Sequence, residues 1–528
     1  HGPAVVRRFG FTGMYHSLIL YSFCEYLRGY TVPISLCINL SIHIYISNII
    51  FLYFTGTPGL QVGHLTEAST PRDLFDEFFT EDLWRIVVDE TNRYARQKQP
   101  TRSSHMKNWE DVDATELQKY LGLRVLMGWH VLPSFHDYWC SEEFTEVAVV
   151  GKVMTRDRFD AIRSHIHFNN NEDPKAKDDR LFKIRPVLEC FLERFRAVYT
   201  PAQSVCVDES LFRYRGRHSC VQFIPTKRSR YGLKAYKLCE SNGPATGYTS
   251  AMKIYMGDDR QRDQPASFGV VMHLMKEAEL FDKGYIVYMD NYYTSPTLFH
   301  HLQSRKTAAI GTVRPNRKHM PALVVEKKGD VAFKSSRTGQ VAVAWRDKKT
   351  VMCLSTLHKN AATVDVATRR QGIVKAKPVV VVDYNKGKAG VDVSDQYAAS
   401  YAVRRKCVKW YQTLFCHLID TVVVNAYLIH RVLGGKMSHI SFRKDLTRSL
   451  CGRDGPRTPR QRRPPPPPAA PAAPEGHALV RTEDDKYRRC KMCSSTTGKR
   501  KVNKYECRLC NAGFCPGACF NAWPAHKE

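Results

Sequence analysis

The first third of the chain carries the apolar spacing of amphipathic helices. Helix starts, in which a capping side chain precedes an acidic first turn, lie at residues 69–73 and 113–116. The stretch 179–199 has the same helical spacing, and Pro186 within it should start or kink the main helix. We therefore predict a helical segment over residues 69–203.

From residue 204 the pattern changes to short apolar runs that are typical of strands. The runs are SVCVDES, KAYKLCE, GYTSAMKIYMG and KGYIVYMDN. After the last run, Ser295 provides a helix cap and Pro296 the first helical residue, so the chain passes from strand to helix within a few residues. This alternation predicts an α/β core with a mixed sheet.

Valine-rich pieces broken by charges and glycine follow, and they favour a β-rich insertion over residues 312–379. The pieces are ALVVEK, GQVAVAW, TVMCLST and KPVVVVDY. Residues 399–451 return to helical spacing, with an apolar stripe that core packing explains most simply. The stripe consists of Leu414, Leu418, Val422, Ala426 and Ile429. The proline-rich residues 452–484 predict a stiff linker before a cysteine-rich module at 485–528.

The N-terminal residues 1–68 are predicted to be an uncertain hydrophobic extension. Residues 37–54 (CINLSIHIYISNIIFLYF) are long enough to span a bilayer. However, Pro33 precedes them, and asparagine, serine and histidine side chains interrupt them. We expect a mis-joined or non-native extension and no membrane association, with a membrane anchor as the alternative.

Charge adds a class of partner to this picture. The 80 Lys and Arg side chains outnumber the 51 Asp and Glu, which gives a net charge of +29. Such an excess attracts polyanions, most commonly nucleic acid, although a solvated basic surface is the plainer alternative. The cysteines before residue 452 are scattered without the spacing of a disulfide framework, which indicates a reducing compartment.

Three aspartates are candidates for catalysis. We predict that Asp208, Asp290 and Asp392 lie at strand ends, where α/β sheets expose side chains to a shared crevice. Three carboxylates supply the hard oxygen ligands that hold two divalent ions for phosphoryl transfer on DNA. The pattern alone leaves open a second interpretation, in which each aspartate is an ordinary turn or cap residue.

The C-terminal module contains two C-x-x-C pairs, at residues 490–493 and 507–510. Paired knuckles of this kind place four thiolates around zinc, and a module this small needs the metal for stability. Additional ligands would allow one or two Zn²⁺ ions, and free reactive thiols are the alternative. The candidate ligands are Cys490, Cys493, Cys507, Cys510, Cys515, Cys519 and His526, and His477 could complete the set.

Basic side chains accompany the cysteines and recur near the first aspartate. Residues 486–504 contain eight Lys and Arg and no acid, which predicts salt-dependent DNA binding. The aromatic and basic groups at 213–217, at 227–234 and around Trp410 could stack on flipped bases and contact phosphates. They could equally be strand residues with solvated charges, and both interpretations stay open.

Several blocks of the sequence resemble piggyBac transposases and the domesticated proteins derived from them. The blocks similar to the family's three catalytic blocks are VDESLFRYRGR (207–217), MDNYYTSPTLFHHL (289–302) and YNKGKAGVDVSDQ (384–396). Flanking stretches at 154–170, 180–195 and 404–430 are also similar, so the resemblance covers about residues 70–450 in the family's order. TKRSRYGLK (226–234) departs from the family, whose members commonly show Lys-Pro and Trp there.

The resemblance implies an RNase H-like catalytic core over residues 204–311 and 380–398, interrupted by the insertion and flanked by helical segments that dimerise and grip DNA. It also implies a DDD triad of Asp208, Asp290 and Asp392 that binds two Mg²⁺ or Mn²⁺ ions, with Asp395 as a supporting acid. The family's C-terminal zinc module binds the element's terminal DNA. The implied partners are double-stranded DNA with terminal repeats, a TTAA target and a second copy of the chain, in the nucleus, with no small-molecule substrate.

Three functional hypotheses follow from the sequence. The first is an active cut-and-paste transposase that nicks the element ends by hydrolysis, forms hairpins and transfers strands into TTAA. The second is a domesticated DNA-binding protein that keeps the fold without transposition. The third is an interaction or membrane protein that uses the zinc module as an adaptor.

Overall fold

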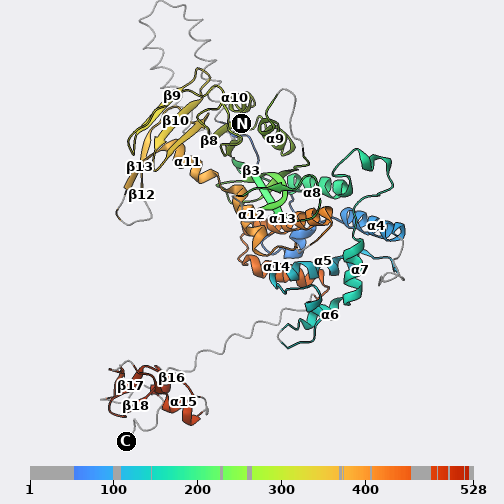
Figure 1. Cartoon of the computed structure of the whole chain (residues 1–528), viewed down its shortest axis with the longest axis vertical. Coiled ribbons are helices and arrows are strands. Elements are labelled where there is room, and N and C mark those ends of the chain that lie inside the picture. The colour runs from blue at the N-terminus through green and yellow to red at the C-terminus, as the bar shows by residue number, and fades with distance from the viewer. Residues whose placement is uncertain are drawn as a thin grey trace, which may run out of the picture. The chain divides into compact units, whose positions relative to one another are not determined.

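The computed structural model describes residues 53–98, 109–143, 145–225, 230–257, 264–367, 372, 374–404, 407–453, 477–483, 486–496, 500–516 and 518–521. Contacts divide the chain into two compact units on either side of Arg453 (Figure 1). Almost all of the hydrophobic stretch 37–54 lies outside the described residues.

Local sequence signals start the helices of the first segment as predicted. The Thr70 side chain accepts a hydrogen bond from the amide of Asp73, whose carboxylate accepts one from the Thr70 amide. The Asp113 carboxylate accepts from the Glu116 amide, and Pro186 lies in the first turn of its helix. The helices are α3 (Pro71–Asp76), α4 (Glu81–Gln97), α5 (Ala114–Trp129), α6 (Ala148–Val153), α7 (Arg156–His165) and α8 (Arg185–Val198), with short 3₁₀ turns at His136–Trp139, Pro174–Lys177 and Phe182–Ile184.

A nine-stranded sheet forms the centre of the body. Its strands are β3 (Ser204–Arg213), β4 (Gln222–Phe223), β5 (Tyr231–Glu240), β6 (Thr249–Ile254), β7 (Ile286–Met289), β8 (Ala308–Thr312), β9 (Val331–Ser335), β10 (Val341–Arg346) and β11 (Thr350–Ser355). The order is β4-β5-β3-β7-β8-β11-β10-β9, and β6 also pairs with β5. β3 is antiparallel to β5 and parallel to β7, which is parallel to β8. Two short strands, β1 (Gly59–Leu60) and β2 (Tyr199–Thr200), pair separately.

Helices cover both faces of this sheet. One face packs on α9 (Ala266–Glu277) and α10 (Pro296–Ser304), around side chains such as Val205 and Val207. The other face packs on α11 (Val379–Gly387) and α12 (Gly390–Ser400), around Cys206. Because side chains of a strand alternate between faces, Asp208 lies on the same face as Cys206, toward α11 and α12.

The valine-rich insertion contains one helix where the sequence favoured a strand. β9, β10 and β11 extend the central sheet from β8, and β12 (Thr363–Ala367) pairs with β13 (Val374–Pro378) as a separate hairpin. The prediction for KPVVVVDY was wrong beyond its first two residues, because the chain becomes helical at Val379. Burial of Val380, Val381 and Tyr384 against the sheet outweighs the β preference of the valines.

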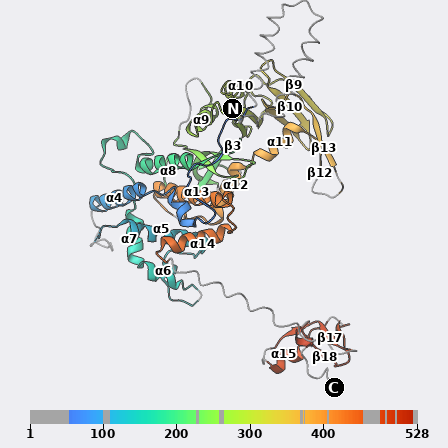
Figure 2. The same cartoon turned by 180° about the vertical axis from the view of Figure 1, so that it is seen from behind.

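A helical layer combines segments from both ends of the body. α13 (Trp410–Val432) packs on α3, α8 and α12, and α14 (His439–Leu450) packs on α3 and α5 (Figures 1 and 2). The predicted apolar stripe of α13 is confirmed, but its polar side chains are buried as well. α13 is long and apolar enough to cross a membrane, and its apolar window is completely buried in the body, as in a core helix.

The C-terminal unit is small. It contains β14 (Leu479–Arg481), β15 (Arg488–Arg489), α15 (Lys491–Thr496), β16 (Val502–Asn503), β17 (Tyr505–Cys507), β18 (Ala512–Gly513) and α16 (Ala518–Asn521). Its apolar cluster includes Cys507, Phe514 and Phe520. So small a core supplies little stability by itself, which favours support from metal ligation.

Candidate active site and metal-binding clusters

Strand register places Asp208 next to Asp290. β3 and β7 run parallel, with Val207 paired to Met289, so the following residues, Asp208 and Asp290, lie side by side on adjacent strands. Asp290 follows β7 as predicted. The prediction of a strand end was wrong for Asp208, because β3 continues to Arg213 by pairing with β5 after its pairing with β7 has stopped.

Burial and the charges of neighbouring carboxylates raise the pKa of both carboxyl groups. For Asp208, burial is the largest cause, and the neighbouring Glu209 and Asp290 add to it, so that its pKa rises to about 8. The Glu209 amide donates to Asp208 Oδ1 at 2.7 Å and opposes this rise only in part. Burial, followed by the charge of Glu209, also raises the pKa of Asp290. A divalent cation between these carboxylates would relieve the repulsion.

Asp392 and Asp395 lie on α12, so the prediction of a strand end was wrong for Asp392 as well. The chain enters a helix there because α12 packs lengthwise on β3. Gly390 approaches β3 so closely that an added Cβ would lie 3.1 Å from Cys206 Cβ. Five residues later, Asp395 Oδ1 accepts a hydrogen bond from Ser210 Oγ at 2.8 Å.

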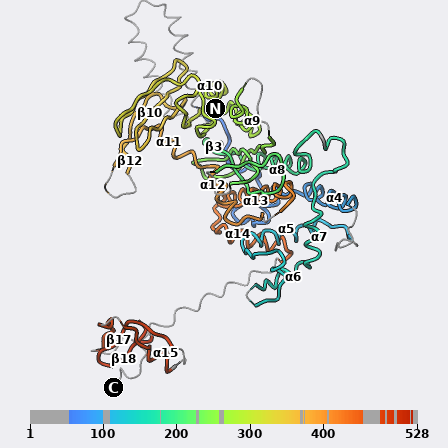
Figure 3. The backbone as a smooth tube through the Cα atoms, in the orientation of Figure 1, coloured from blue at the N-terminus to red at the C-terminus, as the bar shows by residue number. Residues whose placement is uncertain are grey.

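These two contacts lie on either side of Asp208 along β3, since Cys206 and Ser210 are the residues two before and two after it on the same face. α12 runs beside β3 (Figure 3). Asp392 lies between these two contacts on α12 and is therefore level with Asp208. Its carboxylate is exposed, and among the described residues it makes no side-chain hydrogen bond or ion pair. The contacts thus bring Asp208 and Asp290 together directly, whereas Asp392 reaches their level only through its helix.

Sequence reasoning missed two residues beside the acids. Lys237 on β5 is fully buried and its Nζ lies 3.0 Å from Asp395 Oδ1. Ser210 on β3 donates to the same oxygen atom. The only available signal for Lys237 was a charge in the middle of the strand-like run KAYKLCE, and Ser210 gave no signal at all.

An open cleft lined by arginines adjoins Asp395. Its basic side chains come from β3, from the residues around β4 and β5, and from the segment after α12; they are Arg213, Arg215, Arg230 and Arg404. Two of these belong to the aromatic and basic group at 213–217. Tyr214 instead donates to the Val408 carbonyl at 2.6 Å and is buried, and Trp410 packs on His218 with ring centroids 4.9 Å apart. The arginines therefore favour an anion-contacting role, and the aromatic rings a structural one.

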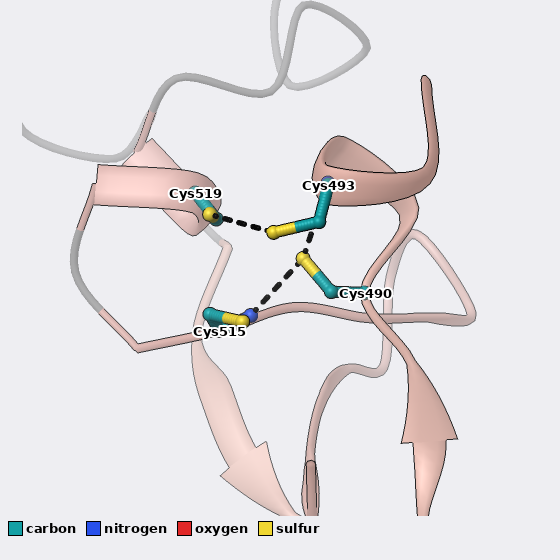
Figure 4. A group of neighbouring side chains, drawn as sticks. All are labelled: Cys490, Cys493, Cys515 and Cys519. Carbon is teal, nitrogen blue, oxygen red and sulfur yellow. Dashed lines mark hydrogen bonds between the residues drawn. The ribbon is translucent and has the colours of Figure 1, made fainter. Parts of the chain in front are cut away.

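Four cysteines of the C-terminal unit form one candidate metal site (Figure 4). Cys490 and Cys493 come from the start of α15, and Cys515 and Cys519 from the loop after β18 and from α16. The Cys493 and Cys519 sulfur atoms are 3.6 Å apart; tetrahedral thiolates around zinc lie about 3.8 Å apart, given Zn–S bonds of about 2.3 Å. Although burial opposes it, hydrogen bonds from the Cys493 and Cys515 amides lower the pKa of Cys490 to about 7.

The second C-x-x-C pair, Cys507 and Cys510, lies beside His477 and belongs to a separate cluster from Cys490 and Cys493. His477 Nδ1 lies 3.5 Å from Cys507 Sγ and 3.3 Å from Cys510 Sγ. The sequence left the pairing of the two knuckles open, and the structure places them in separate clusters, because β17 pairs with β14 and so brings the second pair beside His477. His526 lies outside the described residues.

Comparison with known proteins identifies the family of proteins to which the chain belongs. The family model for Transposase IS4 matches residues 70–427, which is more than half of the chain. Together with its relatives, this match shows that the chain belongs to the piggyBac-type transposase family.

The relatives include two human proteins and one solved structure. PiggyBac transposable element-derived protein 2 (Homo sapiens) is 26% identical over 448 residues, covering 81% of this chain and 72% of that protein. PiggyBac transposable element-derived protein 3 (Homo sapiens) is 25% identical over 470 residues, covering 85% and 75%. A cryo-EM structure of a piggyBac transposase synaptic complex with hairpin DNA has a TM-score of 0.66 at 23% identity, over 87% of this chain and 99% of that one, which shows a common fold.

The raised pKa of Asp208 predicts a pH-dependent stability. The folded, metal-free protein keeps a proton on Asp208 up to about pH 8, whereas the unfolded chain releases it near pH 4, so raising the pH across this window favours unfolding. We expect the free energy of unfolding of the wild type to fall relative to that of Asp208→Asn between about pH 5 and pH 8, as measured by denaturant titration. Asp157→Asn, which alters an exposed carboxyl, is the control. Parallel pH profiles for the wild type and Asp208→Asn would contradict this prediction.

The cysteine clusters predict two separable metal ions. We expect the purified protein to carry zinc in both clusters, so that His477→Ala loses one ion and Cys493→Ser the other. Native mass spectrometry of the full chain measures this, with His300→Ala on α10 as the control. Unchanged metal content in both cluster variants would refute the assignment.

Proposed function

We propose that this chain is a DNA transposase that cuts and pastes DNA with the help of divalent metal ions. The observation that carries the proposal is the pair Asp208 and Asp290, two partly buried carboxyl groups with raised pKa values that adjacent parallel strands bring together. Like charges in such a place are costly for stability and are arranged where a site needs them.

The strand order supports an RNase H-like core. Strands β6, β5 and β3 form an antiparallel meander, and β7 and β8 follow in parallel beyond β3, with α9 and α10 as the crossovers. The chain then leaves through the insertion and returns as α11 and α12 on the opposite face. The common fold with a piggyBac transposase agrees with this assignment.

The donor set fits magnesium or manganese. Asp208, Asp290 and Asp392 would hold two ions through carboxylate oxygens, which are the ligands these hard cations prefer. When bound, the ions activate the attacking oxygen and stabilise the leaving one. Asp395 is already bonded to Ser210 and Lys237, so its role is to support the site.

The arginine-lined cleft supports DNA as the substrate. Its guanidinium groups adjoin Asp395 and would hold phosphates of the strand to be cut, each displacing counterions. The proposed reaction is hydrolytic nicking at the element ends, hairpin formation by the freed 3′-hydroxyl, and strand transfer into TTAA. We further propose that the zinc-binding module contacts terminal DNA, and that the protein acts as a homodimer in the nucleus.

A second candidate is a domesticated DNA-binding protein without transposition activity. The observation that favours it is the identity of about one quarter to two human proteins that are named as derived from a transposable element. Both candidates share the fold and the cleft, and they differ in whether the carboxylates still support cleavage.

Cleavage of DNA tests the proposal. The substrate is a duplex with the inverted repeats and TTAA sites that flank the gene, incubated with Mg²⁺. We expect the wild type to nick it and Asp290→Asn to lose this activity by at least about 100-fold, since removing even an outer-sphere partner of a metal ligand costs 10–100-fold. Gel analysis of the labelled strands measures the products.

Asp282→Asn provides a charge-matched control, because Asp282 is a half-exposed acid in a positive-φ turn before β7, a conformation that asparagine also tolerates. It should nick like the wild type. Binding of the duplex without nicking would favour the domesticated protein, and neither binding nor nicking would overturn both candidates.

A further inference from the structure

A buried cation on the acid-bearing face of the sheet has no role in the proposed chemistry. Lys237 lies in the middle of β5, and among the described residues it is the only buried lysine. Its side chain is 0% exposed, against 33% for that of its partner Asp395. Burial of an ammonium group is costly unless it is paired and hydrogen-bonded, so the contact with Asp395 has to offset that cost.

The position of Lys237 connects the two halves of the site. In the β3–β5 register Lys237 is directly opposite Asp208, so both side chains are on the face that α12 covers. From there its Nζ donates to Asp395 Oδ1, which also accepts from Ser210 Oγ. Two donors on adjacent strands, Lys237 of β5 and Ser210 of β3, thus hydrogen-bond to the same carboxylate oxygen of Asp395 on α12.

These bonds attach the acid-bearing face of α12 to the sheet. Asp392 and Asp395 are three residues apart and lie on neighbouring positions of the same helix face. Elsewhere α12 is held by packing of the buried Val391 and Ala398 and by Ser394, whose Oγ lies 3.2 Å from Thr249 Oγ1. Among the described contacts, the bonds to Asp395 are the ones that act one turn away from Asp392 on its own face.

We propose that Lys237, together with Ser210, is a positioning residue that holds Asp395 and thereby presents Asp392 beside Asp208 for metal binding. The inference rests on the proposed function for its metal, and on the observed contacts for its geometry. A purely electrostatic role would have the opposite consequence: removing a positive charge near the carboxylates would tighten the binding of a divalent cation. Loss of positioning would weaken it.

The test uses Lys237→Met, which keeps the length of the side chain and removes its charge. We expect hydrogen exchange of the amides of residues 390–400 to become at least roughly 10-fold faster, because the helix loses its anchor. We also expect Mg²⁺ affinity, measured by calorimetry on the full chain, to fall, and nicking to fall by about 100-fold, as for a small misplacement of a reacting group. Lys237→Arg, which keeps the positive charge, should restore a substantial part of the protection from exchange, of the Mg²⁺ affinity and of the nicking activity.

Lys234→Met is the matched control, since Lys234 lies on the same strand and the opposite face, against the rings of Tyr236 and Tyr255. In Lys234→Met, hydrogen exchange of the amides of residues 390–400 should be as slow as in the wild type. Wild-type exchange in Lys237→Met, or tighter Mg²⁺ binding without faster exchange, would overturn the proposal.

If Lys237→Met does not fold, two further variants test whether Lys237 and Ser210 hold Asp395 and with it α12. Ser210→Ala removes only the second donor and should accelerate exchange in the same residues to a smaller extent; unchanged exchange counts against the proposal. Lys237→Met combined with Asp395→Asn removes both charges of the pair and should still accelerate exchange in residues 390–400; exchange at the wild-type rate counts against the proposal. If the wild type binds no Mg²⁺, the proposed function fails, and the exchange measurement still decides whether Lys237 fixes α12.

Discussion

The docking of α12 along β3 is the contact on which the candidate site depends. β3 and β7 alone bring Asp208 and Asp290 together through their parallel register. The third acid belongs to a segment that returns only after the whole insertion, and it reaches the sheet because Gly390 admits close approach to Cys206 and Asp395 bonds to Ser210 and Lys237. Without that docking the sheet would carry two acids and no third ligand.

The two acids at the sheet lie in a partly buried environment. Burial and the charges of neighbouring carboxylates raise the pKa of Asp208 and Asp290, so the metal-free protein keeps an electrostatic cost at this place. Such a cost is characteristic of sites whose stability is given up for binding or chemistry. The arginines of the neighbouring cleft line the side of the site that adjoins Asp395.

Local rules of sequence predicted much of this fold, and contacts between distant segments explain the rest. The caps at Thr70, Asp113 and Ser295 and the strands β3, β5, β6 and β7 follow from side-chain chemistry within a few residues. Helix α11 was mistaken for a strand, because burial of its valines against the sheet decides its form. The pairing of the cysteines stayed open in the sequence, since it depends on the β14–β17 pairing that brings His477 to the second knuckle. Lys237 was missed because only the β3–β5 register reveals that it faces the acids.

We propose that Asp208, Asp290 and Asp392 form one site for divalent metal ions. Electron paramagnetic resonance of Mn²⁺ titrated into the zinc-loaded protein measures this directly, because bound and free Mn²⁺ have distinct spectra. We expect two bound Mn²⁺ ions in the wild type, as in two-metal sites, with a spin–spin interaction that is lost when Asp208 is replaced by asparagine. Absence of bound Mn²⁺ in the wild type, or an unchanged spectrum in that variant, would contradict it.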